Sequence, residues 1–121
     1  MSQHPIVHVE IPVTHPEQDG QFYAELFGWD IQTMSMPGMD YTGFRAGDGP
    51  GGGLPRIDGE MHKANEPLVY VGTDDVTATL EKAVGLGSTV VMPKMEIPGM
   101  DWMGIFVDPS GNRIGLYQDG V

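Results

Sequence analysis

The feature of this sequence that most constrains its fold is a repeat at an offset of about half the chain. Residues 36–44 read MPGMDYTGF, and residues 97–105 read IPGMDWMGI, an offset of 61 residues in a chain of 121. Each copy contains a Pro-Gly turn, a Met-Asp pair, an aromatic residue and an apolar run that predicts a strand. We therefore interpret the chain as two copies of one module, residues 1–59 and residues 60–121.

Both modules show the predicted element order β-α-β-β-β. Alternating apolar residues predict a strand at 5–13, and a helix follows that begins with Thr14 and Glu17 as a capping box and ends at Gly28. Further strands of the first module are expected at 29–35, 40–46 and 53–57, with 49–53 as a mobile glycine-rich connection and 58–67 as a polar connector. The second module has expected strands at 68–73, 88–92, 100–107 and 113–118, and a helix that Asp74 or Asp75 caps and Gly87 ends.

This element order predicts an α+β fold in which the two tandem modules form a curled, cleft-enclosing mixed sheet. One face of each sheet is expected to pack against its helix, and the opposite face is expected to line the cleft, because successive strand residues alternate between faces. This alternation predicts which residues line the cleft. They are His8 and Glu10 on the first strand, Leu68, Tyr70 and Gly72 on the fifth, and Arg113, Gly115 and Tyr117 on the eighth. Tyr41 and Trp102, at equivalent repeat positions, are expected at its mouth.

The charge balance limits the partners. Six Lys and Arg stand against 17 Asp and Glu, a net charge of −11, which argues against nucleic acid and anionic membranes as partners. The acidity favours a cationic small ligand at long range, or it serves solubility alone. The sequence has no cysteine, no signal-peptide pattern and no apolar run long enough for a membrane helix, so a cytoplasmic location is predicted.

Two local motifs accompany the repeat: the opening Ile6-Val7-His8-Val9, and the segment Asp108-Pro109-Ser110-Gly111-Asn112 before the last strand. Together with the repeat, they resemble the vicinal oxygen chelate superfamily, which includes glyoxalase I, bleomycin resistance proteins and extradiol dioxygenases. The resemblance covers essentially the whole chain and is greatest to small glyoxalase-like members. It implies one compact glyoxalase-like domain on a scaffold that hosts many chemistries.

The resemblance also implies where a metal would bind. Metal-dependent members take four His, Glu or Gln ligands from the first, fourth, fifth and eighth strands. His8 matches the first position, whereas the others fall near Leu54 or Pro55, on Leu68 and on Gly115, and none of these binds metal. No cofactor is therefore expected. The alternative is a divalent ion held by a partial set that Glu10 or Gln118 would complete.

His8 and Glu10 are the candidate catalytic pair, because a carboxylate and an imidazole on one strand face can divide the base and acid roles. The alternatives are a half-buried histidine and a plain polar strand face. The candidate substrate-binding residues are Tyr41, Leu68, Tyr70, Trp102, Gly115 and Tyr117. The aromatic members can stack on a ring or a cation, or can equally pack between modules or at a dimer seam. His4, His15 and His62 are scattered over predicted loops and carry little weight.

The favoured functional hypothesis is a glyoxalase-like protein that binds a small organic molecule in the groove between the sheets. Whether it is an enzyme stays open; the candidate activities are those of a lactoylglutathione-lyase-like lyase or isomerase and of a dioxygenase-related enzyme. The alternatives are a bleomycin-resistance-type protein that sequesters a drug or metabolite, and a metal-dependent lyase or dioxygenase. The expected partners are a small-molecule ligand and a second copy in a homodimer, with a compact monomer as the alternative.

Overall fold

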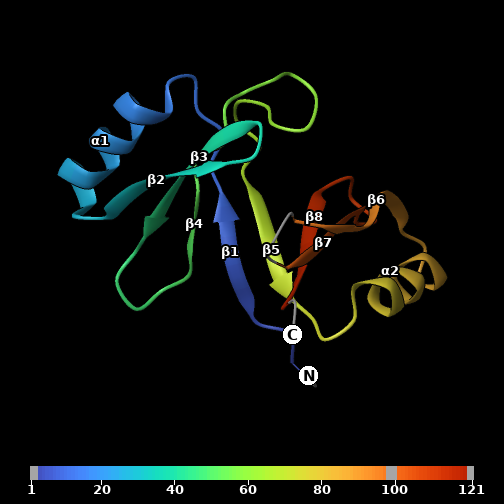
Figure 1. The fold of residues 1–121 in the computed structure, drawn as a ribbon. Coiled ribbons are helices and arrows are strands. Elements are labelled where there is room, and N and C mark those ends of the chain that lie inside the picture. The colour runs from blue at the N-terminus through green and yellow to red at the C-terminus, as the bar shows by residue number, and fades with distance from the viewer. Residues whose placement is uncertain (1–2, 98–100, 120–121) are drawn as a thin grey trace. The chain divides into compact units, whose positions relative to one another are not determined.

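The fold is described by a computed structural model for residues 3–97 and 101–119 (Figure 1). Within these ranges the elements are β1 (Ile6–Glu10), α1 (Pro16–Phe27), β2 (Asp30–Met36), β3 (Met39–Arg45), β4 (Gly51–Gly53), β5 (Leu68–Gly72), α2 (Val76–Gly85), β6 (Thr89–Glu96), β7 (Trp102–Val107) and β8 (Arg113–Gln118). The α+β class and the repeated β-α-β-β-β order are thereby confirmed. The second Pro-Gly turn of the repeat lies outside the described residues. In the described part of the chain, neither helix has the length and apolar character needed to span a membrane.

The strands form a mixed sheet in the order β2-β3-β4-β1-β5-β8-β7-β6. β1 pairs in parallel with β4, and β5 pairs in parallel with β8, whereas the pairs β2–β3, β3–β4, β6–β7 and β7–β8 are antiparallel. The two halves of the repeat therefore share one pairing scheme. The order starts at β2 and ends at β6, and the curl and the cleft predicted from the sequence stay predictions.

The chain divides into two compact units. The N-terminal unit comprises His8–Leu68, and the C-terminal unit comprises the residues up to Val7 together with those from Val69 onward. The division falls inside β1, whose first two residues belong to the C-terminal unit. The module boundary between residues 59 and 60 stays a prediction.

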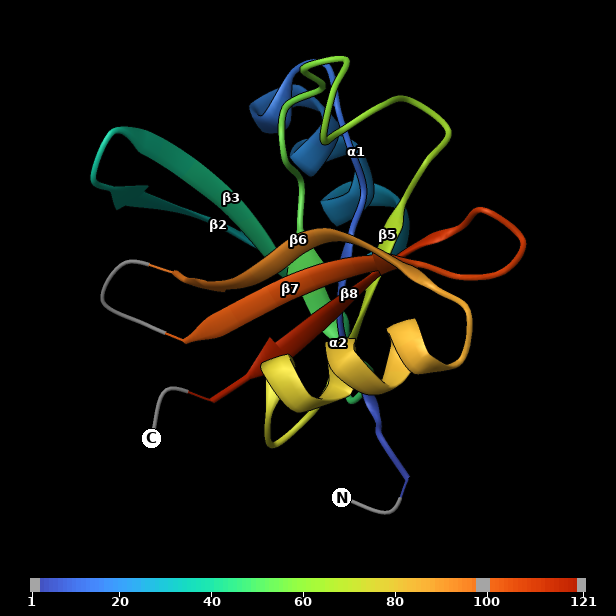
Figure 2. The same cartoon turned by 90° about the vertical axis from the view of Figure 1, so that its right-hand side faces the viewer.

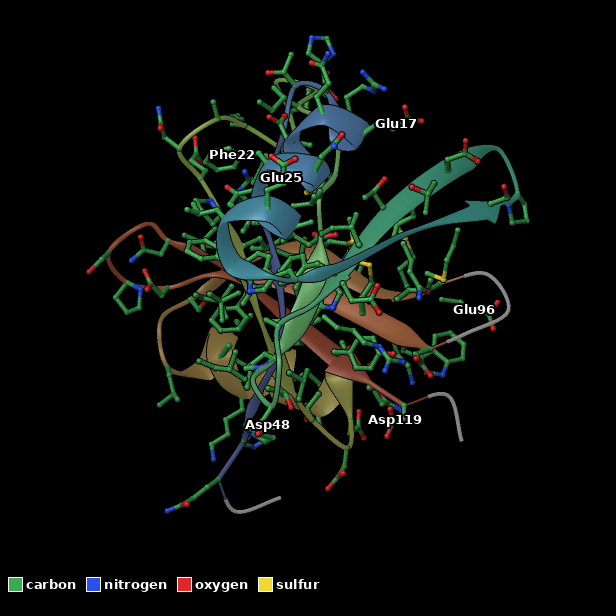
Figure 3. All side chains as sticks on the ribbon, turned by 90° about the vertical axis from the view of Figure 1, so that its left-hand side faces the viewer. Glu17, Phe22, Glu25, Asp48, Glu96 and Asp119 are labelled. Atoms are coloured by element: carbon green, nitrogen blue, oxygen red, sulfur yellow. The ribbon has the colours of Figure 1, made fainter. Side chains whose placement is uncertain are left out.

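In the N-terminal unit, α1 packs on a core of buried Val13, Phe44 and Leu54. The rings of Trp29 and Phe44 stack here, with centroids 4.4 Å apart. The helix ends as predicted at Gly28, whose φ of 74° is left-handed and which donates its N–H to the carbonyl of Ala24. The outer face of α1 carries Glu17, Phe22 and Glu25, which are exposed (Figure 3).

The start of α1 differs from the sequence expectation. Its N-cap is His15, with no side-chain capping bond, so the predicted capping box of Thr14 and Glu17 is wrong. The backbone N–H of His15 donates instead to Asp19 Oδ2 at 3.2 Å. An acidic first turn also matches the positive end of the helix dipole.

In the C-terminal unit, α2 packs against β6, β7 and β8 (Figure 2). Its N-cap is Asp75, one of the two predicted residues, whose side chain accepts from the N–H of Ala78. Val76, Leu80 and Leu116 form the buried core, with Trp102 and Phe106 packed against it.

The glycine-rich segment forms a strand, so the predicted mobile connection at 49–53 and the predicted strand at 53–57 are both wrong. β4 comprises Gly51–Gly53, paired with β1 on one side and β3 on the other. A Cβ at Gly52 would lie 1.8 Å from the carbonyl oxygen of Val9, and a Cβ at Gly53 would lie 1.7 Å from the Tyr41 hydroxyl. Glycine is required because neighbouring groups already occupy the side-chain space.

This close approach makes Gly52→Ala a sharp test of the fold. The new methyl group would overlap a backbone carbonyl, so β1 and β4 must separate, and the free energy of unfolding should fall by about 3 kcal/mol or more. Gly85→Ala is the matched control, because nothing lies within 4 Å of its Cβ position in α2. The control should be neutral or stabilise by up to about 1 kcal/mol. Urea denaturation of both variants measures the difference, and equal stability would contradict the strand pairing.

Candidate functional site

Three predicted residues of the N-terminal unit come together around the carboxylate of Glu10. His8 and Glu10 project from the same face of β1, and Tyr41 reaches them from β3. The Tyr41 hydroxyl donates to Glu10 Oε2 at 3.0 Å. His8 Nε2 lies 3.1 Å from the same hydroxyl oxygen. Because the Tyr41 proton is directed at Glu10, His8 donates from Nε2, which defines a hydrogen-bonded chain from His8 through Tyr41 to Glu10.

β4 creates the space that this chain needs. Gly53 pairs with Glu10 across the parallel strands, and the tip of the Tyr41 side chain fills the position of the missing Cβ. Any larger residue at 53 would push the hydroxyl away from the carboxylate. The glycine run therefore positions Tyr41 as well as joining two strands.

A fourth residue, His62, completes the site and was missed by the sequence analysis. Its Nε2 lies 3.4 Å from Glu10 Oε1, the oxygen not used by Tyr41. His62 belongs to the connector after β4, where no hydrophobic period fixes the direction of a side chain. The one sequence signal is Asp58-Gly59, a turn pair four residues before it.

The surroundings favour distinct protonation states. Burial lowers the pKa of His8 below its usual 6.5, and the nearby Glu10 charge opposes this only in part. Burial, the Glu10 charge and the hydrogen bond to Glu10 all raise the pKa of Tyr41 far above its usual value. At neutral pH, Tyr41 is therefore a fixed hydroxyl donor and His8 is a neutral imidazole. A buried carboxylate that accepts from such a hydroxyl can act as a general base.

The other predicted lining residues lie in different surroundings. Leu68 and Tyr70 are buried, with 4% and 5% of their surface exposed. Tyr70 lies against Gly115, where a Cβ would be 2.5 Å from the tyrosine ring. The Tyr117 hydroxyl donates to Asp101. Trp102 packs on the core beneath α2, and Lys94 Nζ lies 4.7 Å from its ring centroid. The roles of these residues in ligand binding stay predictions.

The residues present do not fit a divalent metal ion. Leu54, near the second expected ligand position, is 1% exposed in the core of the N-terminal unit. The fourth position, Gly115, has its side-chain space filled by Tyr70. In residues 3–97 and 101–119, no three His, Cys, Asp or Glu side chains are placed to share an ion. Catalytic sites for such ions normally supply three protein ligands, so we derive no step through a metal.

The fold and the site define a small α+β protein of paired β-α-β-β-β modules with polar side chains gathered around the buried Glu10. The chain belongs to the Glyoxalase/Bleomycin resistance protein/Dioxygenase superfamily, whose family model matches residues 5–116. This confirms the resemblance drawn from the sequence.

Two curated relatives show moderate identity. "Putative glyoxylase CFP32" of Mycobacterium tuberculosis is 29% identical over 91% of this chain and 44% of its own length. The anthracycline biosynthesis protein DnrV of Streptomyces peucetius is 31% identical over 83% of this chain and 42% of its own length. The chain thus spans less than half the length of these relatives.

Solved structures share the fold at low identity. Methylmalonyl-CoA epimerase from Mycobacterium tuberculosis has a TM-score of 0.75 at 13% identity, covering 96% of this chain and 88% of that one. The hypothetical protein BH1468 from Bacillus halodurans has a TM-score of 0.73 at 11% identity, covering 98% and 96%. At these identities the likeness concerns the fold alone.

The lowered pKa of His8 predicts a pH dependence of stability. Below pH 6.5 the unfolded chain binds a proton at His8 that the folded chain binds only at lower pH, so the free energy of unfolding should fall as pH drops from 6.5 toward the folded pKa. In His8→Gln, an amide can keep the donor to Tyr41 but does not titrate. Urea denaturation at pH 7.5 and 5.5 should show a smaller loss of the free energy of unfolding in the variant than in the wild type. An equal loss in both proteins would contradict the lowered pKa of His8.

Proposed function

We propose that this chain binds a small organic carbonyl compound beside Glu10 and acts on it as a glyoxalase-like lyase or isomerase. The observation that carries the proposal is the Glu10 carboxylate itself, 7% exposed and hydrogen-bonded by Tyr41. Burying a charge is costly, so a carboxylate retained in this position has a use beyond solubility. The groove predicted from the sequence is part of this proposal.

Glu10 would remove a proton from the carbon next to the carbonyl group. Negative charge then develops on the carbonyl oxygen. Protonation of Glu10 removes the charge that held the Tyr41 proton, so the Tyr41 hydroxyl can turn its proton toward that oxygen while His8 still donates to the hydroxyl oxygen. A hydroxyl held close to the reacting group in this way can stabilise the developing charge. For an α-hydroxy carbonyl compound such as a hemithioacetal, the product of this step is an enediolate. Return of the proton from the Glu10 carboxyl group to the former carbonyl carbon, with passage of the hydroxyl proton from the first oxygen to the second, moves the carbonyl group to the adjacent carbon and completes the isomerisation.

The relatives support this class of reaction. One is named as a glyoxylase, and the family match covers nearly the whole chain. A metal-dependent lyase or dioxygenase is the less favoured alternative, because the described residues offer no ligand set for the ion. Homodimer formation remains a prediction.

A second candidate is a protein that sequesters a drug or metabolite. The observation that favours it is the 31% identity to an anthracycline biosynthesis protein. The net charge of −11 would also draw a cationic ligand toward the protein. In this case Tyr41 and Glu10 contact the ligand, and no bond in the ligand changes.

Glu10→Gln separates the two candidates. Turnover is measured with the hemithioacetal of methylglyoxal and glutathione as substrate, and the product is detected by NMR. Ligand binding is measured separately, through the fluorescence of an added anthracycline. As a catalyst, the variant should lose turnover by about a hundredfold or more while remaining folded, because glutamine cannot accept the proton. Glu25→Gln, on the exposed face of α1, is the matched control and should retain full turnover. Unchanged turnover in Glu10→Gln would refute the role of Glu10 as the general base. If the wild type shows no turnover but binds the anthracycline tightly, the sequestering function is favoured.

A further inference from the structure

We propose that His62 is a positioning residue that fixes the Glu10 carboxylate, and that the Asp58 turn holds His62 in place. This inference rests on the proposed role of Glu10 as the reacting group. The Nε2 atom of His62 lies 3.4 Å from Glu10 Oε1. The carboxylate therefore has a donor from β3 on one oxygen and an imidazole from the connector on the other.

The connector is built as a closed turn around Asp58. Asp58 Oδ1 accepts the backbone N–H groups of Glu60 at 2.8 Å and His62 at 2.9 Å. In return, the carbonyl oxygen of His62 accepts from the N–H groups of Asp58 at 3.0 Å and Gly59 at 3.2 Å. These bonds fix the backbone of His62 from both sides. The backbone N–H groups of His62 and Glu60 lower the pKa of the exposed Asp58 carboxyl group, so it stays ionised at neutral pH.

The turn is also tied to the body of the N-terminal unit. The N–H of Ile57, immediately before Asp58, donates to the carbonyl oxygen of Val13 at 2.8 Å. Val13 is part of the buried core beneath α1. The path from the core to His62 is therefore short and hydrogen-bonded, which is the support that a positioned functional group needs.

Two contacts on different oxygens have a defined effect. A carboxylate held on one oxygen can rotate about its last bond, whereas contacts on both oxygens fix its plane. Proton transfer depends steeply on that orientation, because a misplacement of about 1 Å can cost about a hundredfold in rate. Loss of His62 should therefore reduce kcat while changing KM little.

The test uses two disruptive variants and two conservative ones in the full chain. His62→Leu removes the imidazole, and His62→Gln keeps an amide donor near the Nε2 position. Asp58→Ala removes the acceptor of the turn, and Asp58→Asn keeps an acceptor oxygen at Oδ1. Circular dichroism confirms folding of each variant. The ligand-free readout is the ¹³Cδ NMR resonance of Glu10 at constant pH.

His62→Leu and Asp58→Ala should move the Glu10 resonance by more than its linewidth, whereas His62→Gln and Asp58→Asn should leave it near the wild-type position. With hemithioacetal as substrate, the disruptive variants should lose between about tenfold and a hundredfold in kcat, with KM changed less than about twofold. An unmoved resonance in both disruptive variants overturns the positioning role. Because the NMR readout needs no turnover, absence of catalysis would refute the proposed function, and the resonance alone would then decide whether His62 fixes the carboxylate.

Discussion

The site depends on one hydrogen bond, from the Tyr41 hydroxyl to the buried carboxylate of Glu10. A buried charge persists only when hydrogen bonds replace its lost hydration, and this bond, at 3.0 Å, is shorter than the 3.4 Å contact of His62 with the other oxygen. Its geometry determines the composition of the strand beside it. Because the Tyr41 side chain occupies the side-chain space at 53, that position must be glycine, whereas the carbonyl oxygen of Val9 imposes the same requirement at Gly52. The pairing of Gly53 with Glu10 and the hydrogen bond of Tyr41 therefore meet at one position of the sheet.

Both units use an aromatic ring to fill space at a glycine on an inner strand. In the N-terminal unit Tyr41 fills the space at Gly53, and in the C-terminal unit Tyr70 fills the space at Gly115. In metal-dependent members that the sequence resembles, the position of Gly115 carries a ligand. Here the same volume holds a tyrosine ring. In each unit, the side-chain space of one inner-strand position is therefore given to a tyrosine ring.

The sequence allowed the element order to be predicted because periodic apolar runs and turn residues mark it directly. His8 and Glu10 were placed on one face since alternation along a strand is reliable. The fourth strand was predicted at 53–57 rather than at Gly51–Gly53, because three glycines carry no strand signal. The reasons for Gly52 and Gly53 lie in Val9 and Tyr41, which are far away in sequence. The position of His62 beside Glu10 was not predicted, because a connector has no hydrophobic periodicity from which the direction of a side chain can be inferred. Tyr41 and Trp102 match in the repeat, yet Trp102 packs beneath α2, because a shift of one residue exchanges the faces of a strand.

The central claim is that this site works through a carboxylate and organic hydrogen-bond donors, without an ion beside His8. The most direct test is elemental analysis of the protein, purified without chelator from medium supplemented with Zn, Ni, Fe and Mn, in parallel with Glu10→Ala. We predict metal contents well below one ion per chain, equal in both proteins. One ion per chain in the wild type, lost in the variant, would contradict the claim.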